Sequence, residues 1–219
     1  GEHDWWAKNR MPLYNEIANV PLFFYHPDYK KYQGEERDVV SQNIDLMPTF
    51  LSMHGHSIPK EVTGKSLIEF LDRDSSQKYS ALYGYWGGGI NITDGEYTYF
   101  HYPENFSQQK PNRYQYTLMP THMRQFFSLE ELQTASLHKP FEFTKDVPVL
   151  KINRIEKKTD GGYKGYADTK SALYNLNKDP GQLNSIQDKD LILKYKKLMI
   201  DQIKKYDPPQ ELLENYFEF

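Results

Sequence analysis

The run Val20-Pro21-Leu22-Phe23-Phe24-Tyr25 constrains the fold of this chain more than any other stretch. Six consecutive apolar residues fit a β-strand that is buried on both faces, as in a parallel sheet covered by helices on both sides. Pro27 ends the run, because proline restricts the residue before it and supplies no N–H donor. The polar residues upstream include His3 and Lys8. A loop rich in ionisable groups that leads into a buried strand is typical of the rim of an active site.

The composition predicts a folded domain and indicates no nucleic-acid or membrane partner. Of the 219 residues, 38% are apolar and 15% are aromatic, which is enough for a packed core in one large domain or two small ones. The net charge of −3 comes without a basic stripe that nucleic acid could bind. No apolar run approaches the length that spans a membrane. The absence of cysteine excludes disulfides and thiolate sites in this stretch, and it slightly favours a cytoplasmic location.

Residues 45–55 predict a helix. Asp45 is a suitable N-cap, and Pro48 is tolerated only in a first turn, where its missing N–H costs little. Gly55 closes the helix. One apolar face is predicted at helical spacing, consisting of Met47, Phe50 and Leu51.

The pattern changes to period two between residues 78 and 100, which predicts strands at 80–86, 90–93 and 97–100. Asp94-Gly95 between two such runs is a strong hairpin signal, so these strands are expected to pair antiparallel. Asp94 and Glu96 are interpreted as turn residues, not as an acid–base pair. The shift in pattern places a boundary near residues 72–78.

The C-terminal half predicts further strands and helices. A capping box at Ser128 and Glu131 precedes a short helix to about Leu137, and residues 147–155 predict an extended segment. Residues 172–186 predict a half-buried strand and an Asp-Pro turn. A helix is expected at 190–206, with an apolar stripe at Ile192, Tyr195, Met199 and Ile203. The aromatic tail, Tyr216, Phe217 and Phe219, is expected to dock on the body.

Two blocks of this sequence resemble the sulfatase branch of the alkaline phosphatase superfamily. The first is G-E-H-x-x-W-x-K, then L-Y-N-E and V-P-L, between Gly1 and Leu22. The second is residues 172–186, where Gln182 and Ile186 depart from the Glu and Leu of the sulfatase pattern. The resemblance implies the C-terminal portion of an α/β sulfatase fold. Residues 1–75 would belong to the large α/β domain and supply a core strand and helices. Residues 76–219 would form a smaller α+β subdomain, with an antiparallel sheet packed on a C-terminal helix and an insertion at 103–145.

The resemblance also implies a chemistry. Lys8 would bind the sulfate group and stabilise charge on the leaving oxygen, and His3 would assist as a substrate contact or proton donor. A formylglycine nucleophile, made from the Cys or Ser of a C/S-x-P-x-R segment, and a divalent cation, calcium by preference, would lie upstream. This chain contains no C/S-x-P-x-R segment and no predicted metal ligand or cofactor site. The fragment alone is therefore expected to be inactive.

Several alternatives remain open at this stage. Lys8 could be a solvated surface lysine and His3 a loop histidine bonded to backbone. Trp5 and Trp6 could be loop anchors or a sugar platform. The parent protein could be a phosphodiesterase or phosphonate ester hydrolase of the same superfamily, or a non-catalytic binding or scaffolding domain. The expected partners are the missing N-terminal part of the same protein and a sulfate ester. A homodimer through an exposed sheet edge is also possible.

Overall fold

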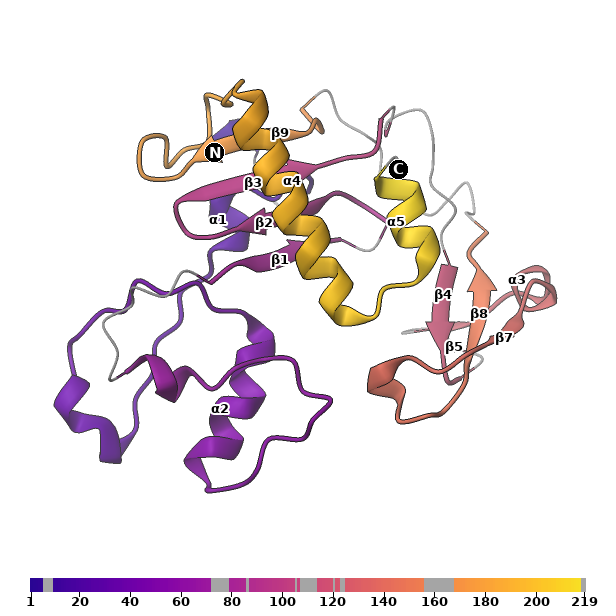
Figure 1. Cartoon of the computed structure of the whole chain (residues 1–219), viewed down its shortest axis with the longest axis horizontal. Coiled ribbons are helices and arrows are strands. Elements are labelled where there is room, and N and C mark those ends of the chain that lie inside the picture. Colours follow the sequence, from indigo (N-terminus) through magenta and orange to yellow (C-terminus); the bar gives the residue numbers. More distant parts are fainter. Residues whose placement is uncertain are drawn as a thin grey trace.

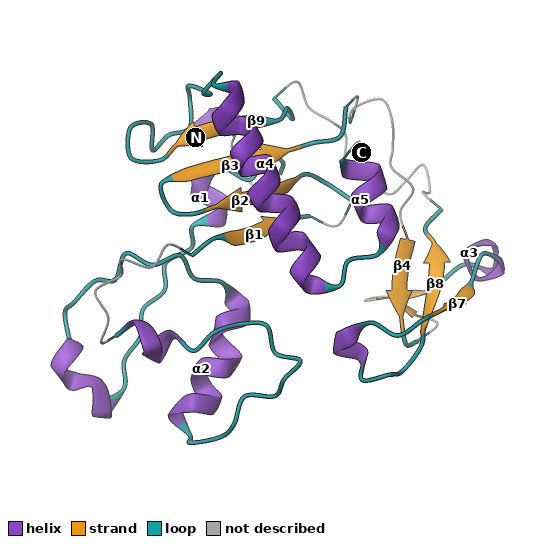
Figure 2. Cartoon of the chain, viewed as in Figure 1, coloured by secondary structure: helices purple, strands orange, loops and turns teal. Residues whose placement is uncertain are grey.

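The structure is a computed structural model that describes residues 1–5, 10–71, 79–85, 87–104, 106, 114–119, 121–122, 125–155 and 168–217. Three parts are visible in Figure 1. A four-stranded sheet crossed by the long helix α4 lies in the middle, a lobe of residues 20–71 lies on one side of it, and a three-stranded sheet lies on the other. Figure 2 shows that loops connect only short helices within the lobe.

The central sheet has the strand order β1-β2-β3-β9, and every neighbouring pair is antiparallel. Its strands are β1 (Ala81–Gly84), β2 (Ile90–Thr93), β3 (Tyr97–His101) and β9 (Ala172–Asn175). The predicted antiparallel pairing of the first three strands is confirmed. The predicted strand in the 172–186 block is confirmed as β9, which joins the sheet beside β3 from far along the chain.

Asp94 and Gly95 form the turn between β2 and β3, as predicted. Gly95 has a φ of 88°, a left-handed conformation that glycine adopts without strain. Asp94 Oδ1 accepts hydrogen bonds from the backbone N–H groups of Glu96 and Tyr97 at 3.1 and 2.9 Å. Asp94 Oδ2 accepts a hydrogen bond from the Tyr195 hydroxyl at 2.7 Å. Both carboxylate oxygens are therefore used to fix the hairpin and to tie it to the next layer.

Helix α4 (Lys189–Ile203) covers one face of the central sheet (Figure 1). Asp188 caps it, because its side chain accepts hydrogen bonds from the N–H groups of Asp190 and Leu191. The predicted helix at 190–206 is confirmed, with its last three residues in a 3-10 turn, Lys204–Tyr206. The predicted stripe packs on the sheet in a core that includes Ile92, Tyr99, Leu173, Tyr195, Met199 and Ile203.

The start of the chain covers the opposite face of the same sheet. Met11 and Tyr14 are buried in a second core with residues of β3 and β9 and their neighbours, Phe100, Tyr102, Phe106 and Tyr174. The short helix α1 (Asn15–Ala18) follows directly. Residues 10–18 thus pack on strands that the sequence assigned to the second part of the chain. The division into 1–75 and 76–219 stays a prediction, and its expected boundary, 72–78, lies outside the described residues.

The strand predicted at Val20–Tyr25 is wrong for this chain. These residues belong to no strand, and the side chains of Val20, Leu22, Phe23, Phe24 and Tyr25 are exposed. After α1 the chain runs away from the central sheet into the lobe (Figure 1). An extended apolar segment becomes a strand only where another strand offers it backbone partners. The parallel pairing expected for this segment is also absent among the described strands, whose pairings are all antiparallel.

Helix α2 (Leu46–Met53) begins after Asp45 and ends before Gly55, as predicted. The predicted apolar face is wrong in part, because Met47 and Phe50 are exposed to solvent. The buried residues of α2 are Pro48 and Thr49. The apolar stripe of α2 therefore points away from the rest of the lobe.

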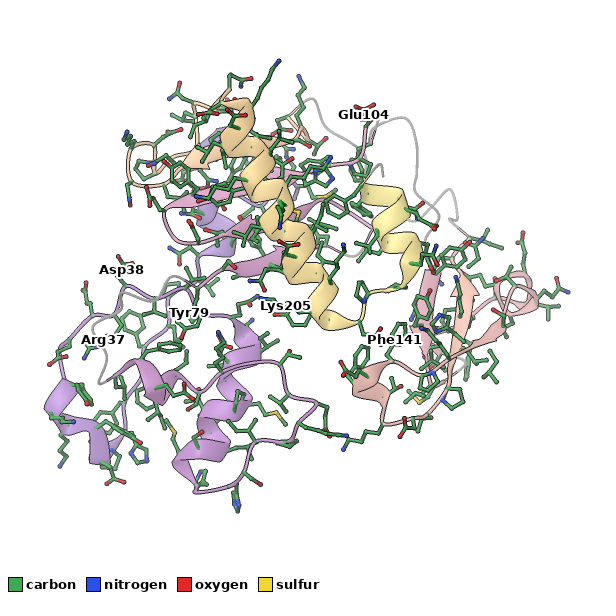
Figure 3. The ribbon with its side chains drawn as sticks, viewed as in Figure 1. Arg37, Asp38, Tyr79, Glu104, Phe141 and Lys205 are labelled. Carbon is green, nitrogen blue, oxygen red and sulfur yellow. The ribbon has the colours of Figure 1, made fainter. Side chains whose placement is uncertain are left out.

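Hydrogen bonds explain the orientation of α2. The Thr49 hydroxyl donates to the carbonyl oxygen of Asp45 at 2.6 Å and accepts from the N–H of Leu67 at 2.8 Å. Asp45 Oδ1 accepts from the N–H of Lys65 at 2.8 Å. These hydrogen bonds hold the loop before the 3-10 helix Leu67–Phe70 against the face of α2 that carries Asp45 and Thr49. Figure 3 shows Arg37 and Tyr79 in the same region, where Arg37 donates to the carbonyl of Leu71 at 2.9 Å.

The second sheet has the order β4-β8-β7 and is antiparallel. Its strands are β4 (Tyr114–Thr117), β8 (Val149–Asn153) and β7 (Ser136–His138), and β5 (Thr121–His122) pairs with β6 (Gln125–Phe126) nearby in sequence. The extended segment predicted at 147–155 is confirmed as β8. Phe141, labelled in Figure 3, precedes the 3-10 helix Glu142–Thr144 and lies edge-on to Tyr116 at 5.0 Å between ring centroids.

Helix α3 (Leu129–Gln133) begins with the predicted capping box, in which Ser128 and Glu131 bond each other's backbone N–H. Its predicted end near Leu137 is wrong, because residues 136–138 form β7. Thr134 explains the change of structure. Its hydroxyl donates to the carbonyl of Glu131 at 2.6 Å and accepts from the N–H of Asn153 at 3.0 Å. The helix therefore ends before residues 136–138, whose backbone pairs with β8 instead.

The C-terminal tail forms a helix that the sequence analysis did not predict, α5 (Gln210–Tyr216). The predicted docking of the tail is confirmed for Tyr216 and Phe217, which are buried in the core under α4. Phe219 lies outside the described residues. The remaining 3-10 helices are Glu2–Asp4, Pro27–Tyr32 and Asn43–Asp45.

His101, at the end of β3, connects the central sheet to this tail. Its ring stacks on Phe217 with 4.6 Å between centroids and 3° between planes. Because a carbonyl can only accept, Nε2 carries the proton and donates to Tyr216 O at 2.5 Å. Nδ1 is then free to accept from the Tyr99 hydroxyl at 3.2 Å. Burial lowers the pKa of His101 below its usual value of 6.5.

This lowered pKa makes the stability of the chain depend on pH. Below pH 6.5 the unfolded chain binds a proton at His101 that the folded chain still excludes, so the free energy of unfolding falls as pH falls from 6.5 toward 5.5. Thermal unfolding across this range should show the decline, and His101→Gln should flatten it. His54→Gln, at an exposed histidine, should leave the decline intact. A decline of equal slope in the His101→Gln protein would contradict the assignment.

Candidate functional site

The predicted site lies at the start of the chain, and the structure describes part of it. Residues 1–5 and 10–14, called the N-terminal loop below, are described, and Lys8 lies outside the described residues, as does Trp6. The predicted sulfate contact of Lys8 therefore stays a prediction. His3, the second predicted site residue, and Trp5 are described.

His3 is held in a defined orientation by its neighbours. Its ring stacks on Tyr14 with 3.6 Å between centroids and 4° between planes. Its Nε2 lies 3.6 Å from Glu16 Oε2, at the first turn of α1. The backbone of His3 is left-handed, with φ of 55°, which is uncommon for a residue other than glycine. Stacking and the carboxylate at Nε2 together fix the ring, as a proton donor requires. The catalytic role of His3 remains a prediction.

Trp5 and Arg10 fasten the loop on either side of Lys8. The Arg10 guanidinium lies over the Trp5 ring at 3.9 Å from the centroid. It also donates two hydrogen bonds to the carboxylate of Asp168, both at 2.8 Å. A planar guanidinium that stacks on one side and binds a carboxylate with two bonds is strongly oriented. Trp5 therefore serves as a loop anchor, the first of its two predicted roles.

The Tyr14 ring packs between His3 and the central sheet. It meets Phe100 of β3 at 5.5 Å and Tyr174 of β9 at 6.3 Å, both edge-on. Burial, and then the neighbouring Tyr174, raises the pKa of Tyr14 well above its usual value. The Tyr14 hydroxyl therefore stays protonated, and Tyr14 supports the site as a packed ring rather than as a base.

Gln182 joins the two sequence blocks that carry the sulfatase resemblance. Its Oε1 accepts a hydrogen bond from the backbone N–H of Asn15, the first residue of α1, at 2.6 Å. The Gln182 side chain is fully buried, and its Nε2 has no hydrogen-bond partner among the described residues. The L-Y-N-E block and the block after β9 are thus neighbours in space. Gln182 is one of the two departures from the sulfatase pattern, and its side chain contacts the start of α1, directly after the N-terminal loop.

The run Gly87-Gly88-Gly89 lets the loop approach the sheet closely. Met11 Sδ accepts a hydrogen bond from the N–H of Gly89 at 3.2 Å. A Cβ on Gly88 would lie 2.5 Å from Met11 Sδ, and one on Gly89 would lie 2.6 Å from the Tyr102 ring. These glycines therefore serve packing under the N-terminal loop.

The described residues contain no group of three His, Cys, Asp or Glu that could hold a metal ion. The H-x-H pair, His54 and His56, is exposed after α2. Within the same described ranges, no helix is both long and apolar enough to cross a membrane.

A family model described as "N-sulphoglucosamine sulphohydrolase, C-terminal" matches residues 1–119, which is more than half of the chain. The chain belongs to this family. The match to the N-sulphoglucosamine sulphohydrolase C-terminal family includes Lys8, His3 and the rest of the described N-terminal loop. The resemblance to the C-terminal portion of sulfatases is therefore confirmed.

Similarity to individual sulfatases covers parts of the chain. It is 32% identical over 90 residues to an N-acetylglucosamine-6-O-sulfatase of Bacteroides thetaiotaomicron, which covers 39% of this chain and 16% of that protein. It is 27% identical over 177 residues to an arylsulfatase of Clostridium perfringens, which covers 79% of this chain and 34% of that protein. The chain thus spans a minor part of the length of these relatives, which are sulfuric ester hydrolases by name.

One solved structure, of a protein bound to its substrate D-glucosamine-2-N,6-O-disulfate, is 16% identical to this chain with a TM-score of 0.36. The similarity covers 74% of this chain and 24% of the other chain.

Sequence reasoning missed the residues that brace the loop of this family member. Asp168 belongs to no motif and lies 158 positions from Arg10, so no local pattern indicates their ion pair. Tyr14 was noted only as part of L-Y-N-E. A signal was present for Gln182, because the departure from the sulfatase pattern drew attention to its position.

Proposed function

We propose that this chain is the C-terminal part of a longer enzyme that hydrolyses sulfate esters. The observation that supports this most directly is the family match over residues 1–119, which includes the ordered N-terminal loop. The sulfatase names of the curated relatives support the same reaction class. The substrate is proposed as a sulfate ester, without a choice between sugar and aryl sulfates.

Lys8 is proposed to bind the sulfate group. When the S–O bond of a sulfate ester breaks, negative charge grows on the leaving oxygen and on the sulfate. An ammonium group fixed beside that charge lowers the barrier by several kcal/mol, because it is more strongly attracted in the transition state than in the ground state. The contacts at Trp5 and Arg10 hold both ends of the short segment that carries Lys8.

His3 is proposed to give a proton to the leaving alkoxide. Its ring is fixed by Tyr14, and Glu16 lies at its Nε2. A fixed ring keeps its N–H directed at one place, which a proton donor to the leaving oxygen requires. The proton that leaves His3 ends on the alcohol product.

The formylglycine nucleophile and the calcium ion of the sulfatase pattern do not fit this chain. The sequence has no cysteine and no C/S-x-P-x-R segment, and the described residues offer no metal cluster. We therefore propose that both groups come from another part of the complete protein. The chain of 219 residues alone is then expected to release no sulfate.

Assay of the complete protein, from the whole reading frame that encodes this chain, tests the proposal. It should cleave an aryl sulfate with a higher kcat/KM than the matching aryl phosphodiester. The isolated chain is the matched control and should cleave neither. A strong preference for the diester would favour a phosphodiesterase of the same superfamily, and no turnover of either ester would favour a binding or scaffolding role.

A further inference from the structure

Gln182 is turned toward the body of the chain by a well-ordered turn. Asp179 accepts hydrogen bonds with both carboxylate oxygens, from the N–H of Leu183 at 3.1 Å and from that of Asn184 at 2.7 Å. The N–H of Gln182 donates to the carbonyl of Asp179 at 3.0 Å. Gln182 is left-handed, with φ of 50°, and is buried, whereas the next residue, Leu183, is exposed. The turn therefore presents one side chain inward, that of Gln182.

Helix α1 receives its first hydrogen bond from this distant turn. The N-cap residue of α1, Tyr14, makes no side-chain hydrogen bond to the helix. The first N–H groups of a helix have no partner within it, and a helix of one turn is marginal without tertiary contacts. Gln182 Oε1 supplies such a partner from 167 positions away, because it accepts from the N–H of Asn15 at 2.6 Å. The start of α1 is thus fixed by a residue that follows β9.

Asn15 lies between the two residues that orient the His3 ring. Tyr14, directly before it, stacks on the imidazole with 3.6 Å between centroids. Glu16, directly after it, places its Oε2 3.6 Å from His3 Nε2. Both side chains leave a backbone that the Gln182 hydrogen bond fixes at Asn15. A shift of that backbone would therefore move the stacking ring and the carboxylate together.

We propose that Gln182 is a positioning residue, which holds the His3 ring in place through the backbone of Asn15. The consequence for catalysis rests on the proposed function, whereas the position of the ring does not. The oxygen of the Gln182 amide carries the role, since Nε2 has no hydrogen-bond partner among the described residues.

Two substitutions separate the oxygen of Gln182 from the size of its side chain. Glutamate at this position keeps an oxygen acceptor at the same place, and methionine keeps a long, unbranched side chain without an acceptor at its end. Neither is branched at Cβ, so the left-handed backbone of Gln182 costs both about as much as it costs glutamine. Gln182→Met and Gln182→Glu therefore form a matched pair.

NMR of the histidine ring protons in the 219-residue chain tests the proposal without any assay of activity. Protons that lie over the face of an aromatic ring resonate upfield, so the stacking on Tyr14 gives the His3 ring a signature. The variant His3→Gln identifies these signals by removing them. Gln182→Met should abolish the upfield shift, and Gln182→Glu should keep it. Gln187→Met, at an exposed glutamine just before α4, is the control and should also keep it.

Three results would overturn the proposal. The first is an upfield His3 signal in Gln182→Met equal to that of the unchanged chain. The second is loss of the signal in Gln182→Glu, because the oxygen acceptor would then not be what holds the ring. The third is a general collapse of the Gln182→Met spectrum that includes Tyr195, which is buried under α4. Gln182 would then support the whole fold and not His3 in particular.

Kinetics of the complete protein connect this positioning to the proposed function. Gln182→Met should lower kcat for an aryl sulfate by about 10- to 100-fold, since a reacting group that is misplaced by an ångström loses up to about 100-fold. KM should change little, because His3 would act as the leaving oxygen departs, and Gln182→Glu should restore kcat. An unchanged kcat in Gln182→Met, together with a lost His3 signal, would overturn the proton-donor role of His3 and leave the positioning standing.

Discussion

Replacing Lys8 by alanine in the complete protein is expected to lower kcat/KM for an aryl sulfate by about 100- to 1000-fold, the usual loss when one group that stabilises transition-state charge is removed. The reason is that charge on the sulfate and on the leaving oxygen would grow without a fixed cation beside it. Most of the loss should appear in kcat, because the interaction strengthens as the bond breaks. Steady-state kinetics with an aryl sulfate measure both constants.

Two variants make the Lys8 result specific. Lys8→Arg should recover only part of the activity, since a planar guanidinium does not place its charge where a compact ammonium does. Lys205→Ala removes an exposed lysine beyond the end of α4 and should leave kcat/KM unchanged (Figure 3). Similar kinetics for Lys8→Ala and Lys205→Ala would return Lys8 to the role of a solvated surface lysine.

Replacing Phe100 by alanine is expected to destabilise the chain by about 3–5 kcal/mol, the range for removing a fully buried aromatic side chain. Phe100 is completely buried where the N-terminal loop meets the central sheet, with Tyr14 at 5.5 Å and Tyr174 at 5.6 Å between centroids. A loss of this size corresponds to a fall of roughly 10 °C in Tm for a domain of this length. Denaturant unfolding of the isolated chain measures the free energy directly.

Phe143→Ala is the matched control for Phe100→Ala. The Phe143 side chain is 56% exposed, so its removal should change the free energy of unfolding by less than about 1 kcal/mol. If Phe100→Ala and Phe143→Ala lower the free energy of unfolding equally, Phe100 is not buried between the N-terminal loop and the central sheet. The loop and the sheet would then not fold as one unit. The support described for His3 would then be wrong.

Local sequence patterns correctly predicted two kinds of element. One is a strand that pairs with its neighbour in sequence, and the other is a helix with one apolar and one polar face. Period two and Asp94-Gly95 were enough for the hairpin of β2 and β3, because the two strands pair with each other. The stripe of Tyr195, Met199 and Ile203 was enough for α4, because only one of its faces is apolar. Its cap, Asp188, was not predicted, and the helix begins at Lys189, one residue before the predicted start at 190.

The wrong predictions share a physical cause. An apolar pattern shows that a segment is suited to burial, but it does not show that another part of the chain is there to cover the segment or pair with it. Phe23 and Phe50 are suited to a core, but the described chain offers nothing to cover them. Leu137 continued a helical pattern, but β8 supplied backbone partners that took residues 136–138 into a sheet. The brace between Arg10 and Asp168 joins distant residues, and its charges give no local signal. The candidate site was therefore located by motif, while its support required the structure.

A crystal structure of the complete protein with bound sulfate would test the central claim most directly. We expect a sulfate oxygen within hydrogen-bond distance, about 3 Å, of Lys8 Nζ, in a site that also contains the nucleophile and the cation. His3, stacked on Tyr14, should lie at the rim of the same site. A sulfate bound elsewhere, with Lys8 directed into bulk water, would contradict the account.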